Sequence, residues 1–297
     1  MKKSRAALLV LWCGVALGAV SATDSSGRRV TLAKPAERII SLAPHATELL
    51  FAAGAGSRLV AASEYSDYPQ AAKRLPRVAS SGAIDLEQVL ALRPDLVVAW
   101  RLEATTKALD RLESLGVLLA YIEPRRLDEI PQAVEILGTL AGTESIARAE
   151  AARLRAELAR LRSAYRGRPA IDVFYQISER PLMTLSSQHF VSDAIALCGG
   201  RNVFANAPII AAAVDAEAVL AANPQAIIAA RTDPADRSWQ GFWLRFGQLR
   251  AVHDGNLLAL RAEEMHRQGP RAIAATAGLC KLLDEARRRS TAARSPR

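Results

Sequence analysis

The chain has 297 residues, half of them hydrophobic, which is enough for one large core or two lobes and excludes a disordered protein. Its formal net charge is +9, but three basic residues lie in the first five positions and five in the last eleven. Without them, the 39 Lys and Arg residues fall to 31, against 30 Asp and Glu residues. The body of the chain is therefore nearly neutral, and the high pI is no argument for nucleic-acid binding.

The first 22 residues have the pattern of a secretory signal: a basic start, an apolar run, and small side chains at Val20 and Ala22. The apolar run of about 15 residues is shorter than the roughly 20 that a membrane-spanning helix needs. A lipid anchor on Cys13 is disfavoured because the bulky Trp12 precedes it. We therefore expect export to the periplasm, with cleavage after Ala22.

Cleavage there removes Cys13 and leaves Cys198 and Cys280 in the mature protein. Two cysteines in an exported chain suggest one disulfide bond. Its loop of about 80 residues would stabilise the fold by up to roughly 4 kcal/mol in the chain-entropy model. The alternative is a pair of buried thiols.

The region from residue 23 to residue 142 alternates short apolar strands with helices. The predicted strands lie at residues 39–42, 58–63, 94–100 and 117–123. The predicted helices lie at residues 48–53, from Asp85, which can cap it, to about Leu92, and at residues 106–115. This alternation favours a mostly parallel sheet in an N-terminal α/β lobe.

A long helix is predicted at residues 143–166, because no glycine or proline interrupts the chain from Thr143 to Tyr165. Leu154, Leu158 and Leu161 fall on one stripe of it. About 22 residues span roughly 33 Å, the width of a small domain. A coiled-coil partner helix would also fit, but α/β pattern on both sides favours a strut between two lobes.

Residues 167–286 repeat the α/β pattern, and residues 214–230 nearly repeat residues 84–100. The matched pairs are Asp85 with Asp215, Glu87 with Glu217, and Pro94 with Pro224. We expect two Rossmann-like α/β lobes joined by one long helix, with a ligand cleft between them at the carboxyl ends of the strands. Residues 287–297 are predicted to form a frayed basic tail.

The sequence contains no GxSxG, Walker, HExxH or strand-linked GxGxxG motif, so nothing indicates an enzyme or a catalytic cofactor. Aromatic residues are scarce, and their loop positions suit a large planar ligand. The candidates are Tyr65, Trp100 at the end of a strand, and the cluster with Trp239 and Trp243. Ordinary packing under loops is the alternative for each of them.

Polar candidates lie at loops that open toward the expected cleft. Glu263 and Arg267 precede the last helix, where they could hydrogen-bond a ligand or simply form a solvated helix start. His45 stands eleven residues before Gly56, as His189 does before Gly200, so both histidines could face the cleft. They could bind a metal chelate, or cap their loops without binding one.

Glu87 and Glu217 each sit near the start of a helix, where the helix dipole alone would favour a carboxylate. The dipole explains one such residue, but not why both lobes carry it. Two equivalent carboxylates on separate lobes could dock into basic pockets on a partner with twofold symmetry.

From Arg38 to Leu283 the chain resembles periplasmic substrate-binding proteins of the helical-backbone class, which serve ABC importers of cobalamin, haem and iron-siderophores. The resemblance rests on "SLAPHATELLFAAG", "YSDYP", "DLEQVLALRPDLVVAWR", "ALCGGRNVF", "VDAEAVLAANPQAII" and "GPR". The segments "YSDYP" and "AWR" point most toward cobalamin, which would be the transported ligand. A haem or ferric-siderophore receptor of the same fold is the alternative.

The resemblance implies two lobes joined by one long helix, a monomer, and a disulfide between Cys198 and Cys280. It implies ligand contacts at Tyr65, Trp100, Glu263 and Arg267, and docking of Glu87 and Glu217 onto arginines of a permease dimer. The cobalamin-binding members carry a tryptophan six residues before each docking glutamate. This chain has Ser81 and Ala211 there, which removes two large rings worth very roughly 1–3 kcal/mol each.

Overall fold

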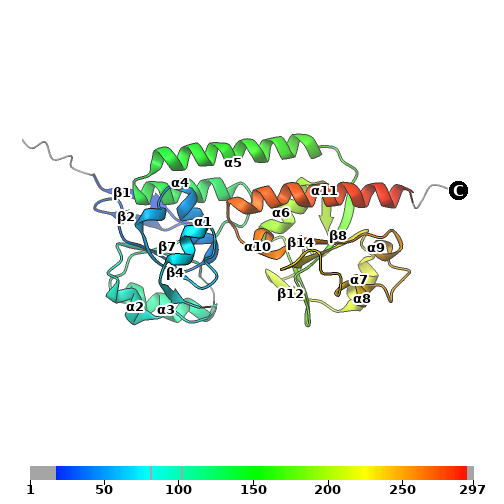
Figure 1. Cartoon of the computed structure of the whole chain (residues 1–297), viewed down its shortest axis with the longest axis horizontal. Coiled ribbons are helices and arrows are strands. Elements are labelled where there is room, and N and C mark those ends of the chain that lie inside the picture. The colour runs from blue at the N-terminus through cyan, green and yellow to red at the C-terminus, as the bar shows by residue number, and fades with distance from the viewer. Residues whose placement is uncertain (1–17, 81, 102, 293–297) are drawn as a thin grey trace, which may run out of the picture.

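The computed structural model describes residues 18–80, 82–101 and 103–292. They form two α/β lobes joined by α5 (Glu144–Tyr165), as Figure 1 shows. The predicted fold class is confirmed, and α5 lies within residues 143–166, where the linking helix was predicted.

The N-terminal lobe contains a five-stranded sheet in the order β5-β4-β3-β6-β7, and every neighbouring pair is parallel. Its strands are β3 (Ile39–Ser41), β4 (Leu59–Ser63), β5 (Arg77–Ala79), β6 (Leu96–Ala99) and β7 (Leu119–Tyr121). Its helices are α1 (Pro44–Ala52), α2 (Leu86–Ala91), α3 (Glu103–Ser114) and α4 (Glu129–Ala141). Alternate residues of β6 pack against α1 and α4 on one face of the sheet and against α2 and α3 on the other.

The C-terminal lobe contains a parallel sheet in the order β11-β8-β13-β14. Its strands are β8 (Ile171–Gln176), β11 (Gly200–Asn202), β13 (Ala226–Arg231) and β14 (Leu257–Arg261). Its helices are α6 (Phe190–Leu197), α7 (Ala216–Ala222), α8 (Gln240–Trp243), α9 (Arg250–His253), α10 (Ala262–Met265) and α11 (Pro270–Ala292). A small antiparallel sheet, which the sequence did not predict, combines β9 (Ser178–Glu179), β10 (Leu182–Leu185) and β12 (Ala211–Ala213).

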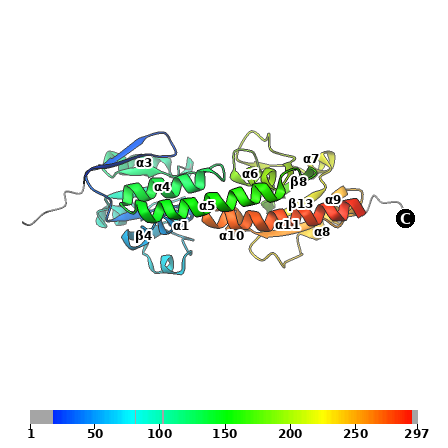
Figure 2. The ribbon, with the colours of Figure 1, turned by 90° about the horizontal axis from the view of Figure 1, so that it is seen from above.

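A layer of long helices covers one side of both lobes. Figures 1 and 2 show α5 lying along α4 of the N-terminal lobe and α11 of the C-terminal lobe. Gly138 allows α4 to approach α5 closely, since a Cβ there would lie 2.2 Å from the Cβ of Ala147. Cys198, after α6, forms the expected disulfide with Cys280 of α11.

The prediction that a frayed tail begins at residue 287 is wrong, because α11 continues to Ala292. Arg287 donates hydrogen bonds to the carbonyl oxygens of Pro169 and Cys198, and Ser290 is buried. These contacts hold the last turns of α11 against the C-terminal lobe, although those turns are rich in arginine.

The first described residues form a hairpin of β1 (Val20–Thr23) and β2 (Arg29–Leu32), which is antiparallel. Residues 1–17, which hold most of the expected signal, lie outside the described residues. Cleavage after Ala22 would remove three residues of β1, so the mature protein would lack this hairpin pairing. Within the described ranges, no helix is both long enough and apolar enough to cross a membrane.

Candidate ligand-binding cleft

A cavity of about 300 Å³ lies between the lobes, with a mostly apolar lining. The N-terminal lobe contributes Trp100, directly after β6, and Pro124, shortly after β7. The C-terminal lobe contributes Ile177 after β8, His189 at the start of α6, and Ala211 in β12. The cavity therefore lies at the carboxyl ends of parallel strands in both lobes, where α/β sheets hold ligands.

Trp100 is the aromatic wall of the cleft on the N-terminal side. Its ring meets the ring of His45 edge-on, with the centroids 5.4 Å apart. His45 is buried, and its Nε2 lies 2.9 Å from the carbonyl oxygen of Ile122. Burial lowers the pKa of His45, so its ring is neutral and donates a hydrogen bond from Nε2 to that carbonyl. The ring thereby packs in a fixed position against Trp100.

His189 is the N-cap of α6, where its Nδ1 accepts a hydrogen bond from the backbone N–H of Val191 at 3.3 Å. Burial, with nearby His266 and His45, lowers its pKa to about 3. Burial also lowers the pKa of His266, a cleft residue that we did not predict, to about 4. Two neutral imidazoles, those of His189 and His266, thus line the cleft, whereas His45 is buried against Trp100 and does not line it.

These histidines do not form a metal site by themselves. Among the residues that the structure describes, no group of three or more His, Cys, Asp or Glu side chains could hold a metal ion. The rings contact other aromatic side chains instead: His189 packs on Phe190 and His266 packs on Tyr175.

Tyr65 does not line this cavity. Its side chain is 67% exposed, and its backbone φ of 60° lies in the left-handed region. Non-glycine residues in that region are uncommon and cluster at functional sites. Its neighbour Asp67 contacts Arg267 of the other lobe, so the loop of Tyr65 lies at the boundary between the lobes.

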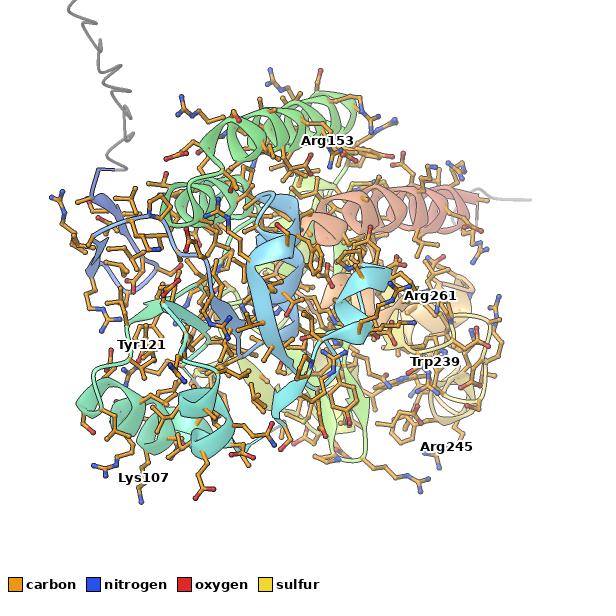
Figure 3. All side chains as sticks on the ribbon, turned by 60° about the vertical axis from the view of Figure 1, so that its left-hand side comes forward. Lys107, Tyr121, Arg153, Trp239, Arg245 and Arg261 are labelled. Atoms are coloured by element: carbon orange, nitrogen blue, oxygen red, sulfur yellow. A yellow bond between two sulfur atoms is a disulfide. The ribbon has the colours of Figure 1, made fainter. Side chains whose placement is uncertain are left out.

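The predicted ligand contacts of Trp239 and Trp243 are wrong for this structure. The two side chains are only 1% and 0% exposed, and both belong to the core of the C-terminal lobe (Figure 3 labels Trp239). The indole N–H of Trp243 donates to Gln176 Oε1 at 2.7 Å. Trp239, the N-cap of α8, and Trp243, its last residue, belong to one apolar cluster with Phe174 of β8 and Val219 of α7.

Arg267 is not free to point into the cleft. Its Nη1 lies 2.5 Å from Asp67 Oδ1 and 3.3 Å from Glu48 Oε1, so it joins the two lobes. Glu263 is exposed on α10. The structure does not bring Glu263 and Arg267 together with Trp100 in the cavity.

Glu87 and Glu217 occupy equivalent places, each the second residue of a short helix. Asp85 caps α2 by accepting from the N–H of Gln88 at 3.0 Å, and Asp215 caps α7 in the same way at 2.7 Å. Both glutamate side chains are exposed, and within the described ranges neither side chain forms a hydrogen bond or an ion pair. Figure 1 shows α2 and α7 on the side of their lobes away from α5.

Sequence reasoning missed several cleft residues, including Gln188, Ile210 and His266. Gln188 and Ile210 come from loops around the small antiparallel sheet, which has no periodic signal in the sequence. Ala211 was singled out only because a tryptophan is missing there, and it does line the cleft. Ser81 lies outside the described residues.

The sequence of this chain is similar to those of known binding proteins. The chain is 39% identical over 253 residues to the vitamin B12-binding protein of Vibrio cholerae serotype O1 strain ATCC 39541, covering 84% of this chain and 90% of that protein. It is 36% identical over 248 residues to the vitamin B12-binding protein of Photorhabdus laumondii, covering 84% and 88%. Both relatives are named as binding proteins and not as enzymes, which agrees with the expectation from the sequence.

Solved structures give the same result. The crystal structure of the periplasmic vitamin B12-binding protein of Vibrio cholerae matches with a TM-score of 0.79 and 39% identity, covering 85% of this chain and 98% of that one. A periplasmic haem-binding protein from Roseiflexus sp. RS-1 matches with a TM-score of 0.72 and 26% identity, covering 84% and 98%. A family model for periplasmic binding proteins matches residues 39–240. The chain therefore belongs to the periplasmic binding protein family.

Proposed function

We propose that this protein is an exported carrier that binds cobalamin, or a related corrinoid, between its lobes and delivers it to an ABC importer. The observation that carries the proposal is the apolar interlobe cleft walled by Trp100, in a chain 39% identical to a vitamin B12-binding protein. Cobalamin is the cargo here and not a catalytic cofactor.

The lining of the cleft suits contact with one part of a large ring system that has polar groups at its edge. The face of Trp100 and the aliphatic side chains of Ile177 and Leu185 offer apolar contact to a macrocycle. Gln188 and Gln268 offer hydrogen-bond donors and acceptors for peripheral amides. The neutral histidines add no charge, and the two charged lining residues, Glu123 and Arg125, form an ion pair at 3.3 Å, which fits a ligand whose ring carries amides rather than carboxylates.

Titration of the purified protein with cyanocobalamin, followed by tryptophan fluorescence, tests this proposal. We expect saturable quenching with a Kd below about 10 μM, equivalent to about −7 kcal/mol. Trp100→Ala should weaken binding, whereas Trp239→Phe, in the buried core, should leave the Kd unchanged. Absence of binding below about 10 μM would remove cobalamin as the ligand.

A haem or ferric-siderophore ligand is the second candidate. Neutral His189 and His266 at the cleft are competent ligands for an iron chelate, and one solved relative is named as a haem-binding protein. A Soret shift on adding haem, lost in His189→Asn, would favour this candidate. Competition between haem and cyanocobalamin for one preparation would rank the two ligands.

We propose that Glu87 and Glu217 dock this carrier onto a permease dimer with basic pockets. The support is their equivalent and exposed placement on both lobes, where neither side chain is paired with another described residue, which suits a partner of twofold symmetry. Glu87→Ala with Glu217→Ala should impair uptake while leaving ligand affinity unchanged. Glu144→Ala, at the first turn of α5 on the other side, is the matched control. A parallel loss of ligand affinity would refute the docking role.

We further propose that the mature protein is periplasmic, monomeric and cleaved after Ala22. The support is the basic and apolar start of the chain together with its membership of a periplasmic family. Mass spectrometry of protein released from the periplasm would measure the mature N-terminus. A mass that retains Val20 to Ala22 would refute this cleavage site and keep β1 intact.

A further inference from the structure

Arg267, in the turn before α11, and Arg271, in the first turn of α11, reach from the C-terminal lobe into the N-terminal lobe. Arg267 Nη1 lies 2.5 Å from Asp67 Oδ1 and 3.3 Å from Glu48 Oε1. Arg271 contacts both oxygens of Glu48, from Nε to Oε2 at 3.0 Å and from Nη2 to Oε1 at 2.6 Å. Glu48 belongs to α1, so these bonds join residues that are 200 to 223 positions apart.

The two ion pairs of Glu48 are more buried than the other ion pairs among the described residues, whereas Asp67, the second partner of Arg267, is 40% exposed. The side chain of Glu48 is 1% exposed, and those of Arg267 and Arg271 are 14% and 21% exposed. By contrast, the Arg101–Asp110 pair within the N-terminal lobe is 42% and 56% exposed. Exposed pairs contribute little, whereas breaking a buried pair leaves an uncompensated charge.

The network also holds the loop that carries Tyr65. Asp67 lies in that loop, and the guanidinium of Arg271 stacks over the ring of Tyr68 at 4.2 Å. The backbone at Gly269 approaches closely, since a Cβ there would lie 3.3 Å from Glu48 Oε2. The ion pairs of Glu48, the stacking of Arg271 on Tyr68 and the close approach of Gly269 are thus all found at the same place between the lobes.

This point lies beside the connecting helix. Glu48, Tyr68 and Arg271 line one cavity of about 350 Å³ together with Arg153 of α5. One helix that joins two lobes still permits rotation of the lobes about its axis. A second attachment beside the helix restricts that rotation, because the lobes are then held at two points.

We infer that Glu48, Asp67, Arg267 and Arg271 form an interlobe clamp, which sets the separation of the lobes and positions the Tyr65 loop for ligand binding. These four residues are positioning residues. In the ligand-free protein, Arg267 affects the cleft through its bonds to Asp67 and Glu48 and not through contact with a ligand. The effect on cobalamin affinity rests on the proposed function, whereas the effect on lobe separation does not.

Spin labels on Lys107→Cys and Arg245→Cys, exposed residues of different lobes that Figure 3 labels, report the lobe separation. In the ligand-free protein, Asp67→Asn and Arg271→Lys should each broaden the distribution of distances between the labels. The same two variants without labels should weaken cyanocobalamin binding about threefold to tenfold. Asp110→Asn, which removes an exposed pair inside one lobe, should change neither measurement.

An unchanged distance distribution in both variants would overturn the clamp, and reduced affinity alone would then indicate direct contact of Asp67 or Arg271 with the ligand. If the unaltered protein fails to bind cyanocobalamin, the proposed function fails. The distance measurement still decides the clamp in that case. If Asp67→Asn fails to fold, Arg271→Lys gives the same test, because the lysine retains the positive charge next to Glu48. If Arg271→Lys fails to fold, Asp67→Asn gives the test.

Discussion

Three buried, neutral histidines, two of which line the cleft while His45 packs against Trp100, make the stability of this protein sensitive to mild acid. His189 and His266 have folded-state pKa values lowered to about 3 and about 4, and burial also lowers the pKa of His45. A histidine with a lowered pKa stays neutral in the folded state while it takes up a proton in the unfolded state. Folded stability is therefore full above the unfolded pKa of about 6.5 and falls as the pH drops below it.

The size of the effect follows from proton counting. Between pH 7 and pH 5, each such histidine costs about 2 kcal/mol of unfolding free energy, because only the unfolded state binds its proton. His189 and His266 together give a loss of about 4 kcal/mol, and His45 acts in the same direction. Carboxyl groups contribute little in this window, since their ordinary pKa values are about 3.9 and 4.3.

Urea unfolding at pH 7, 6 and 5 would measure this loss by linear extrapolation. His189→Asn keeps a capping side chain on α6 and should reduce the loss between pH 7 and pH 5 by about 2 kcal/mol. His253→Asn, which changes a histidine that is 65% exposed, is the control for the histidine-to-asparagine substitution itself. A stability that is flat from pH 7 to pH 5, or an equal effect of both substitutions, would refute the neutral-cluster reasoning.

Three further predictions concern the cleft and the disulfide. Trp100→Ala should weaken cobalamin binding by about 1–3 kcal/mol, or roughly 5-fold to 150-fold in Kd, in the fluorescence titration. Ala211→Trp restores a ring at a cleft position and should tighten binding by a similar amount, measured by calorimetry; weaker binding would show that the cleft has no room for it. Reducing the Cys198–Cys280 disulfide, which closes a separation of 82 residues, should cost about 4 kcal/mol and lower Tm by about 10 °C, and an unchanged Tm would contradict this.

The sequence predicted the lobes because their signals are local and periodic. The cap at Asp85 and the helix after it are confirmed, as are the β6 strand and the 22-residue helix α5. The disulfide implied by the family resemblance is also confirmed. The aromatic cluster at Trp239 and Trp243 misled the prediction, because an apolar ring next to polar residues has the same sequence pattern in a core as in a binding loop.

Contacts between the lobes could not be predicted from sequence. Arg267 was expected to meet a ligand, but its partners lie about 200 residues away, and no periodicity identifies them. The cleft position of His266 depends on how α10 meets the end of β8, which is a tertiary property. Arg287 was assigned to a frayed tail on charge alone, although carbonyl oxygens of the lobe accept its hydrogen bonds.

The repeated segment gives a physical reason to separate the proposed docking role from ligand binding. Glu87 and Glu217 occupy the same place on capped helices in both lobes, and a partner with twofold symmetry requires such equivalence. At the ends of β6 and β13 the equivalence stops, since Trp100 in one lobe corresponds to Ala230 in the other. A corrin ring presents two different faces, so its two walls need not match. The proposal therefore expects the two lobes to be alike at the docking surface and different at the cleft. Exchanging Trp100 and Ala230 should change ligand binding but leave docking unchanged.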